Sequence, residues 1–174
     1  MTIYVLTSTK YTGLLPEFSE RFEKYWGEPF MVYVSNTDIE HWSDGVIDFL
    51  HRISDEYFIL LHEDFYLDRP VDKTLLEYLK NLYRDTDRVS LLGNHTPERT
   101  YSDGAYNIHK GDAEYQFSFE ASIQRKSFLL KYLKPGHDPW EMERVLAKKA
   151  RGNILSSDKP AIWYTDKSRQ LQIQ

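Results

Sequence analysis

The chain has 174 residues and a formal net charge of −5, with 41% hydrophobic and 28% charged residues. These values are typical of a single soluble globular domain, and the negative charge gives no general attraction for nucleic acid. The absence of cysteine excludes a disulfide framework and thiol chemistry. Because no apolar run approaches a membrane span and the N-terminus lacks a signal-peptide pattern, we expect a cytoplasmic protein without a transmembrane segment.

The first third alternates strand-like and helix-like segments. An apolar strand at residues 3–6 runs into the polar loop Thr7–Lys10. Aromatic residues at helical spacing between residues 18 and 26 predict a helix that Gly27 ends. A second strand is expected at residues 30–34, and the next helix begins near Trp42, where Ser43 or Asp44 would cap it.

A buried strand is predicted at the centre of the chain. Residues 57–61 are five consecutive large apolar residues, and His62, Glu63 and Asp64 follow them directly. Such a run reads as a strand that is buried on both faces of a sheet. Ligands of open α/β sheets bind outside the carboxyl ends of the strands, so the triplet marks a candidate site. The alternative is an ordinary strand end with solvated acids.

The second half continues the alternation with a less regular middle. Residues 75–83 predict an amphipathic helix and residues 89–92 a short strand. Residues 96–111 are polar and rich in turns, so we expect a long loop or a poorly packed hairpin. Further strands are expected at 115–119 and 161–164. No linker interrupts the chain, and we predict one α/β domain with a largely parallel sheet.

A second informative cluster lies at residues 134–143. Asp138 followed by Pro139 predicts a helix start with aspartate at the N-cap and proline at the first helical position. Glu141 then falls where its side chain can complete a capping box. Glu141 and Glu143 flank the apolar face of this helix, so either could border a cleft.

Several of these segments together resemble a group of small bacterial and viral glycosyltransferases with a GT-A-like fold. The resemblance covers residues 1–151 and rests on the following segments: Trp42-Ser43-Asp44, Glu63-Asp64-Phe65, Arg69-Pro70-Val71-Asp72, 117–123, Pro135-Gly136 and Pro139-Trp140-Glu141. It implies a single GT-A-like domain over 1–174, with a mixed, mostly parallel sheet flanked by helices. Residues 1–70 would form the nucleotide-sugar-binding half, 71–155 the acceptor half, and 156–174 the last strand and tail.

The resemblance also implies a divalent cation. Asp64, with Glu63 beside it, would hold Mn²⁺ or Mg²⁺ against the donor diphosphate, since these ions prefer carboxylate and phosphate oxygens. His62 occupies the place of the first Asp of the usual Asp-x-Asp arrangement, a departure that puts the metal requirement in question. Three roles stay open for His62: a metal ligand, a hydrogen-bonding partner of a ribose, or a packing residue.

Donor and catalytic residues follow from the same resemblance. Thr7, Ser8, Lys10 and Asp44, together with Glu63, would bind the nucleotide-sugar donor. Glu141 would act as the general base on a hydroxyl acceptor such as a glycan, with Glu143 and Glu120 in reserve. The expected reaction is an inverting, metal-assisted transfer by single displacement.

Two other functions remain open from the sequence. The chain is short for this fold, so it could be a catalytically degenerate domain that binds a nucleotide, a sugar or a protein without turnover. A local excess of Lys and Arg between residues 125 and 151 would suit a transferase that acts on nucleic acid bases, although such residues also suit exposed helix faces.

Overall fold

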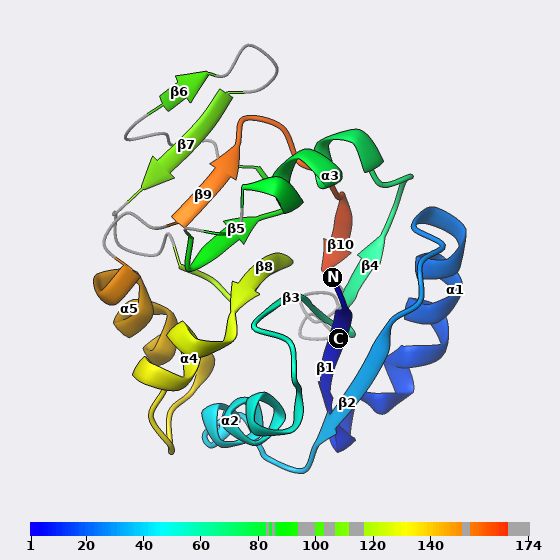
Figure 1. Ribbon diagram of the computed structural model, residues 1–174. Coiled ribbons are helices and arrows are strands. Elements are labelled where there is room, and N and C mark those ends of the chain that lie inside the picture. Colours follow the sequence, from blue (N-terminus) through cyan, green and yellow to red (C-terminus); the bar gives the residue numbers. More distant parts are fainter. Residues whose placement is uncertain are drawn as a thin grey trace.

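The computed structural model describes residues 1–82, 84, 86–93, 100–102, 107–111, 117–150 and 154–166. Most of its strands form an eight-stranded sheet in the order β2-β1-β3-β8-β5-β9-β7-β6 (Figure 1). In chain order these strands are β1 (Ile3–Ser8), β2 (Met31–Ser35), β3 (Tyr57–His62), β5 (Arg88–Ser90), β6 (Thr100–Ser102), β7 (Asn107–Gly111), β8 (Ser122–Arg125) and β9 (Ile154–Ser157). A second sheet pairs β4 (Phe65–Leu67) with β10 (Tyr164–Asp166).

The direction of the strands makes the large sheet mixed and mostly parallel. β1 is parallel to both β2 and β3, and β5 is parallel to β9. β8 runs antiparallel to its neighbours β3 and β5, and β7 runs antiparallel to β9 and β6. The other six strands therefore point the same way. The predicted fold class is confirmed.

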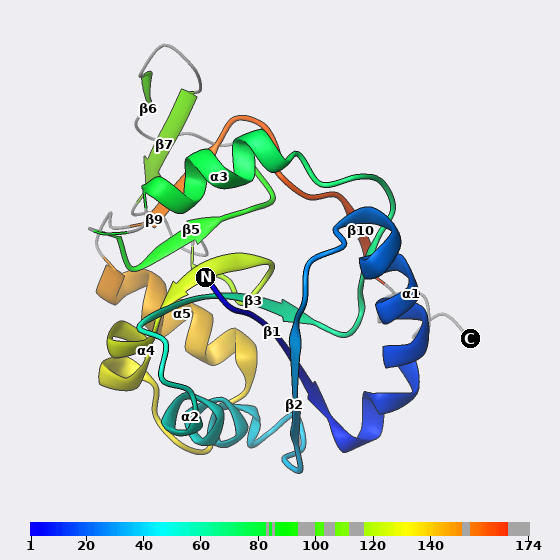
Figure 2. The same cartoon turned by 45° about the vertical axis from the view of Figure 1, so that its right-hand side comes forward.

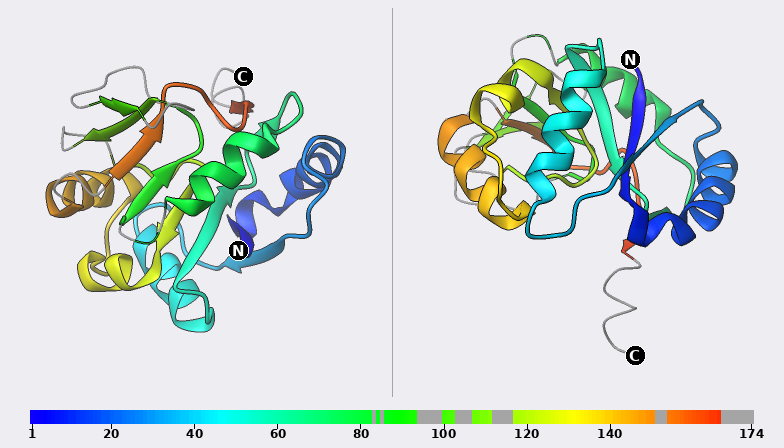
Figure 3. Two further views of the ribbon diagram at one scale, coloured as in Figure 1. Left: turned by 45° about the horizontal axis from the view of Figure 1, so that its top comes forward. Right: turned by 90° about the horizontal axis from the view of Figure 1, so that it is seen from below.

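Helices cover both faces of this sheet (Figures 1 and 3). α1 and α3 lie on one face, while α2, α4 and α5 lie on the other. The helical elements are η1 (Thr9–Leu14), α1 (Leu15–Tyr25), α2 (Trp42–Arg52), α3 (Lys73–Asn81), α4 (Lys126–Tyr132) and α5 (Pro139–Ala150). Among the described residues, no helix is long and apolar enough to cross a membrane.

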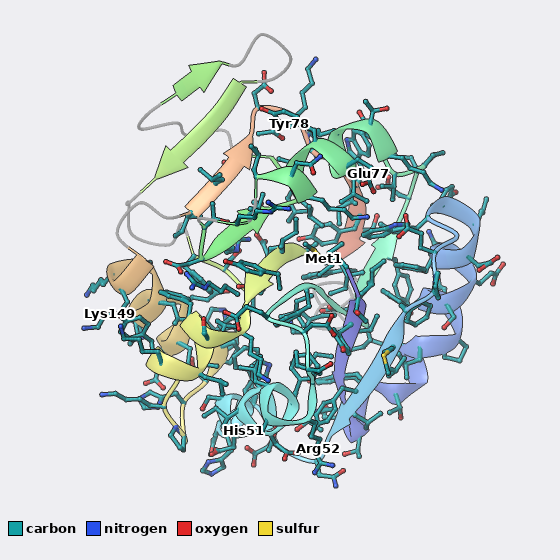
Figure 4. All side chains as sticks on the ribbon, viewed as in Figure 1. Met1, His51, Arg52, Glu77, Tyr78 and Lys149 are labelled. Atoms are coloured by element: carbon teal, nitrogen blue, oxygen red, sulfur yellow. The ribbon has the colours of Figure 1, made fainter. Side chains whose placement is uncertain are left out.

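The alternation of side chains along β1 and β3 divides the core into two layers. Ile3 and Ile59 pack against α1 and α3, whereas Tyr4 and Leu60 pack against α2, α4 and α5. Successive strand residues point to opposite faces, so a strand between two helical layers is apolar throughout. Side chains fill the space between the sheet and the helices on both faces (Figure 4). The central strand is therefore buried on both faces, as its sequence predicts.

Several local predictions also hold. Gly27 ends α1 with a φ of 71°, and its N–H donates to the Phe22 carbonyl at 3.0 Å. α5 begins at Pro139 with a complete capping box. The Glu141 N–H donates to Asp138 Oδ1 at 2.8 Å, and the Asp138 N–H donates to Glu141 Oε2 at 3.3 Å.

Other local predictions are wrong. His41, not Ser43 or Asp44, is the N-cap of α2, and it makes no side-chain cap hydrogen bond. The sequence predicts a strand at 115–119, but Phe117 and Phe119 lie outside any strand although they are buried, and the strand begins at Ser122. Residues 112–116 are outside the described part of the chain. The last strand is β10 and not 161–164. The N–H groups of Ala161 and Ile162 donate to the Leu91 carbonyl and not to a neighbouring strand.

The turn-rich segment after β5 contributes a hairpin. β6 and β7 pair antiparallel, with Thr100 opposite His109, and β7 continues the sheet beyond β9. This hairpin stands at one end of the sheet, far from α1 (Figure 2). The described residues of the segment confirm the hairpin alternative of the prediction.

Candidate functional site

A pocket of about 270 Å³ opens at the carboxyl ends of β1, β2 and β3. Parallel strands end at the same edge of a sheet, so their last residues and the loops that follow them converge there. The far wall comes from the segment before β8 and from the first turns of α5. The lining residues are Leu6, Thr7, Ser8, Tyr11, Ser35, Ile39, Trp42, His62, Glu63, Asp64, Phe65, Phe119, Glu120, Pro139, Trp140 and Glu143.

The strand ends bring hydroxyl groups to one wall. In the parallel ladder Ser8 lies opposite Ser35, and Leu6 lies opposite His62, so all three strands reach the pocket in register. Thr7 and Ser35 are buried. The Ser35 and Thr37 hydroxyls form a 2.7 Å hydrogen bond that fixes the turn after β2. This wall offers hydroxyl groups and backbone amides to a polar ligand.

The triplet at the end of β3 has one buried and two half-buried members. The pKa of Glu63 is raised to about 7, mainly because the side chain is buried and also because the Asp64 carboxylate is close; its own backbone amide and the Thr7 hydroxyl act in the opposite direction. Burial lowers the pKa of His62, against the attraction of Asp64. The His62 ring lies 5.5 Å from the Phe65 ring and 6.4 Å from the Trp42 ring, so it packs among aromatic side chains.

The opposite wall presents the carboxyl group of Glu143. Its Oε1 atom accepts a hydrogen bond of 2.7 Å from the Phe119 N–H, which fixes the side chain on α5 toward the segment before β8. Burial raises the pKa of Glu143, and Glu120 raises it further. The Phe119 N–H and the guanidinium of Arg88 oppose this rise. A fixed carboxyl group with a raised pKa has the properties of a general base.

A buried arginine supports this wall from behind. Arg88 is 3% exposed, and its Nη2 donates to Ser118 Oγ at 2.9 Å. The pKa of Arg88 is lowered to about 10, because the effect of burial outweighs the opposing effect of Glu120 and Glu143. The Ser118 hydroxyl in turn donates to Glu120 Oε2 at 3.1 Å. Arg88 therefore supplies positive charge next to two pocket carboxylates without lining the pocket itself.

The structure brings most of the predicted site residues together and leaves three outside. Thr7, Ser8, His62, Glu63, Asp64, Glu120 and Glu143 all line the pocket. The Lys10 ammonium lies 5.3 Å from the centroid of the Tyr11 ring at the pocket edge. The carboxyl group of Glu141 belongs to the capping box of α5.

Asp44 holds two distant segments together outside this pocket. Its Oδ2 accepts a hydrogen bond of 3.0 Å from the Gly136 N–H, and the neighbouring Ser43 hydroxyl accepts one of 3.0 Å from the His137 N–H. The start of α2 is thereby tied to the loop that precedes α5. The Trp42 ring packs edge-on against Phe119 at 4.4 Å, so the Trp-Ser-Asp motif joins the two walls of the pocket.

Sequence reasoning missed several lining residues. Ser35 ends a parallel strand beside β1, so the rule that located Thr7 and Asp64 would have located it too. Tyr11 and Ile39 follow strand ends by three and four residues, and no residue pattern marks them. Trp140 belongs to the Pro139-Trp140-Glu141 segment, and it also lines the pocket.

The acidic residues do not form a metal centre by themselves. Among the described residues, no three His, Cys, Asp or Glu side chains converge to hold a metal ion. The pocket is lined by the four carboxyl groups of Glu63, Asp64, Glu120 and Glu143, and its described lining contains no Lys or Arg. This donor set fits a Mg²⁺ or Mn²⁺ ion that takes one or two carboxylates from the protein and its other ligands from phosphate oxygens and water.

Comparison with solved structures settles the fold. Staphylococcus aureus TarS 1–349 in complex with UDP superposes with a TM-score of 0.59 at 13% identity, over 95% of this chain and 60% of that one. An LgtC active-site mutant gives 0.53 at 12% identity, over 90% and 72%. A CMP:2-keto-3-deoxy-manno-octonic acid synthetase in complex with CTP gives 0.51 at 14% identity, over 99% and 96%. The chain has a GT-A-like fold.

This GT-A-like domain is short beside several of these structures. It spans about 60% of the TarS 1–349 chain. No protein-family model matches its sequence, and no curated protein sequence matches it either. The similarity is thus one of fold at low sequence identity.

Proposed function

We propose that this protein is a nucleotide-sugar-dependent glycosyltransferase with its active site in the pocket at the ends of β1, β2 and β3. The observation that carries the proposal is the arrangement of the pocket itself. Strand-end hydroxyls and the Glu63-Asp64 pair form one wall, and Glu143 faces them from α5. The similar structures support a nucleotide ligand, since they include TarS 1–349 in complex with UDP and with UDP-GlcNAc.

The donor would bind to the wall formed by residues 1–70. Thr7 and Ser8 would hydrogen-bond the nucleotide at the end of β1, and Lys10 would reach the diphosphate from the rim. Asp64, beside Glu63, would hold a divalent cation together with the phosphate oxygens. When bound, such a cation supplies positive charge that neutralises the leaving diphosphate. His62 would pack behind this site or join it as a ligand.

Residues 71–155 would supply the acceptor side and the base. The acceptor hydroxyl oxygen attacks the anomeric carbon while the bond from that carbon to the diphosphate breaks, and the bonding electron pair leaves with the diphosphate. The hydroxyl proton passes to the Glu143 carboxylate, which is held by the Phe119 N–H. A single displacement of this kind inverts the anomeric centre.

Glu143 is a better base than Glu141 in this arrangement. Glu143 lines the pocket, whereas Glu141 uses a carboxyl oxygen in the capping box of α5. Asp44 would act indirectly, by holding the loop that carries α5 against α2.

The test is a donor panel. UDP-, GDP- and CMP-sugars are incubated with the protein in Mn²⁺ or Mg²⁺, and we measure donor hydrolysis, transfer to simple glycosides and the shift in melting temperature. We expect one nucleotide class to be turned over and to stabilise the protein. Stabilisation without turnover would instead support a binding domain. If the protein shows neither turnover nor stabilisation, the proposal loses its basis.

A further inference from the structure

Exposed apolar side chains gather at the mouth of the pocket. Among the described residues, seven large hydrophobic side chains are exposed, and three of them line this pocket: Tyr11 at 38%, Ile39 at 49% and Trp140 at 62%. Single exposed apolar residues are ordinary on a protein surface, but a group around a cavity marks a binding surface. Trp140 has the most exposed side chain of the seven.

Trp140 lies beside the candidate base. Both residues are on α5, three positions apart, and side chains at this spacing share one face of a helix. Pro139 and the capping box fix the first turn, which holds the backbone of Trp140 in place. A ligand ring that rests on the indole is therefore next to the Glu143 carboxyl group.

The other two exposed side chains belong to the opposite wall. Tyr11 follows β1, and Ile39 lies in the loop after β2, so both extend from the strand ends that carry Thr7 and Ser35. These segments form the proposed donor wall, whereas Trp140 and Glu143 form the wall across from it. Because the two walls are separate, Tyr11 and Ile39 would contact the donor, and Trp140 would contact the acceptor.

The charge of the pocket restricts what the acceptor can be. The described lining contains four carboxyl groups and neither Lys nor Arg. A phosphorylated or carboxylated acceptor would be repelled once an anionic donor is also present, and nucleic acid would lack the basic contacts that dominate its binding. An uncharged acceptor meets no such barrier.

We propose that Trp140 is the platform on which the uncharged pyranose ring of a glycoside acceptor stacks, with one of its hydroxyls directed at Glu143. This inference rests on the proposed function, of which it names the acceptor class. The C–H groups of one face of a pyranose carry partial positive charge and meet the negative face of the indole, and the ring hydroxyls stay free for polar contacts. Trp140 is thus a specificity-determining residue.

Nuclear magnetic resonance tests the contact directly. The chain has four tryptophans, and the indole N–H signal of Trp140 is the one that is lost in W140F. We titrate methyl glucoside, methyl galactoside and methyl mannoside, with sorbitol as the open-chain control and glucose 6-phosphate as the anionic control. At least one methyl glycoside should shift the Trp140 signal in a saturable way, and both controls should bind at least about tenfold more weakly.

Variants separate stacking from a general effect of mutation. W140A has no indole signal at this position, so its glycoside binding is measured on the backbone amide signals of α5. Its affinity should fall about tenfold, which corresponds to about 1.4 kcal/mol. W140F, which keeps an aromatic face, should retain most of the affinity. The matched control is W163F, since the Trp163 ring packs on Arg69 at 5.5 Å and lies outside the pocket lining; its glycoside affinity should be that of the wild type.

The outcomes distinguish this inference from the proposed function. If nucleotide sugars bind but no glycoside moves the Trp140 signal, or if W140A binds glycosides as tightly as the wild type, the inference is overturned and the transferase proposal stands. Equal responses to sorbitol or glucose 6-phosphate also overturn it, as does a Trp140 signal that moves with UDP alone. If glycosides bind at Trp140 but no donor binds or reacts, the transferase proposal fails, and the assignment of Trp140 to an acceptor fails with it.

Discussion

The Glu143 carboxyl group accepts a hydrogen bond of 2.7 Å from the Phe119 backbone N–H. Phe119 also packs against Trp42 at the start of α2, with ring centroids 4.4 Å apart. One segment before β8 therefore holds both the carboxyl group on α5 and the aromatic residue on α2. The candidate base is positioned by contacts with a neighbouring segment as well as by its own helix.

Replacement of Glu143 by Gln should remove the base while preserving the shape of the side chain. We expect E143Q to lower kcat for sugar transfer by about 100-fold or more, the usual loss when a general base is removed. The donor that the panel selects is used, and kcat and KM are measured separately.

Glu141→Gln is the matched control on the same helix. Glutamine completes a capping box as glutamate does, so we expect E141Q to keep the melting temperature of the wild type and a kcat within about threefold of it. A loss in E141Q as large as that in E143Q would show that the base has been assigned to the wrong residue.

The buried Glu63 should make stability depend on pH when no cation is bound. Its pKa is about 7 in the folded protein, against an ordinary value of 4.5, so the folded state holds the proton more tightly than the unfolded state does. The stability that this group contributes is present below pH 4.5 and is lost as pH rises through 7. The shift corresponds to roughly 3 kcal/mol.

Glu63→Gln isolates this effect from the other titrating groups. In a chelator-containing buffer, urea unfolding at pH 5 and pH 8 should show E63Q gaining stability relative to the wild type at the higher pH, by about 2–3 kcal/mol. If the difference between the two proteins is the same at both values, Glu63 does not have the raised pKa.

Gly45 should be required where α2 passes the end of β2. A β-carbon at this position would lie 2.6 Å from Thr37 Oγ1 and 3.0 Å from Ser35 Cβ. Gly to Ala inside a helix normally stabilises by about 1 kcal/mol. Here we expect G45A to destabilise by about 1–3 kcal/mol, because overpacking displaces the turn after β2.

The same change should weaken donor binding, since Ser35 lines the pocket. Gly13→Ala is the control, because a β-carbon there would meet no atom within 4 Å. Unfolding in urea and the donor-induced thermal shift measure the two effects. A G45A protein as stable as the wild type would contradict the close approach of α2 to β2.

The sequence alone predicts the sheet and its site better than the contacts between distant segments. Thr7 lies near the end of β1 and Asp64 lies just after β3, and parallel strands end at one edge, so their meeting in one pocket was predictable. Asp44 follows the local pattern of a helix cap, yet its carboxylate binds Gly136, 92 residues away. Local propensity carries no information about such a partner.

The sequence also gives no indication that a charged residue is buried behind the pocket. Arg88 reads as an ordinary polar residue before a short strand, and only the fold places it behind Glu120 and Glu143. Phe117 and Phe119 alternate as a strand would, because both pack into the core, but the Phe119 N–H bonds to Glu143 rather than to a neighbouring strand. A pattern of burial does not by itself specify the backbone hydrogen bonds.

The most direct test of the central claim is calorimetric titration of the nucleoside diphosphate, beginning with UDP, in the presence of Mn²⁺. The wild type, D64A and the control D68A are compared, since Asp68 pairs with Arg69 on the surface outside the pocket lining. We predict that D64A binds at least about tenfold more weakly, a loss of roughly 1.4 kcal/mol, at an unchanged melting temperature, while D68A binds as the wild type does. Equal affinity of the wild type and D64A, or no binding by the wild type of any nucleotide in the panel, would contradict the account.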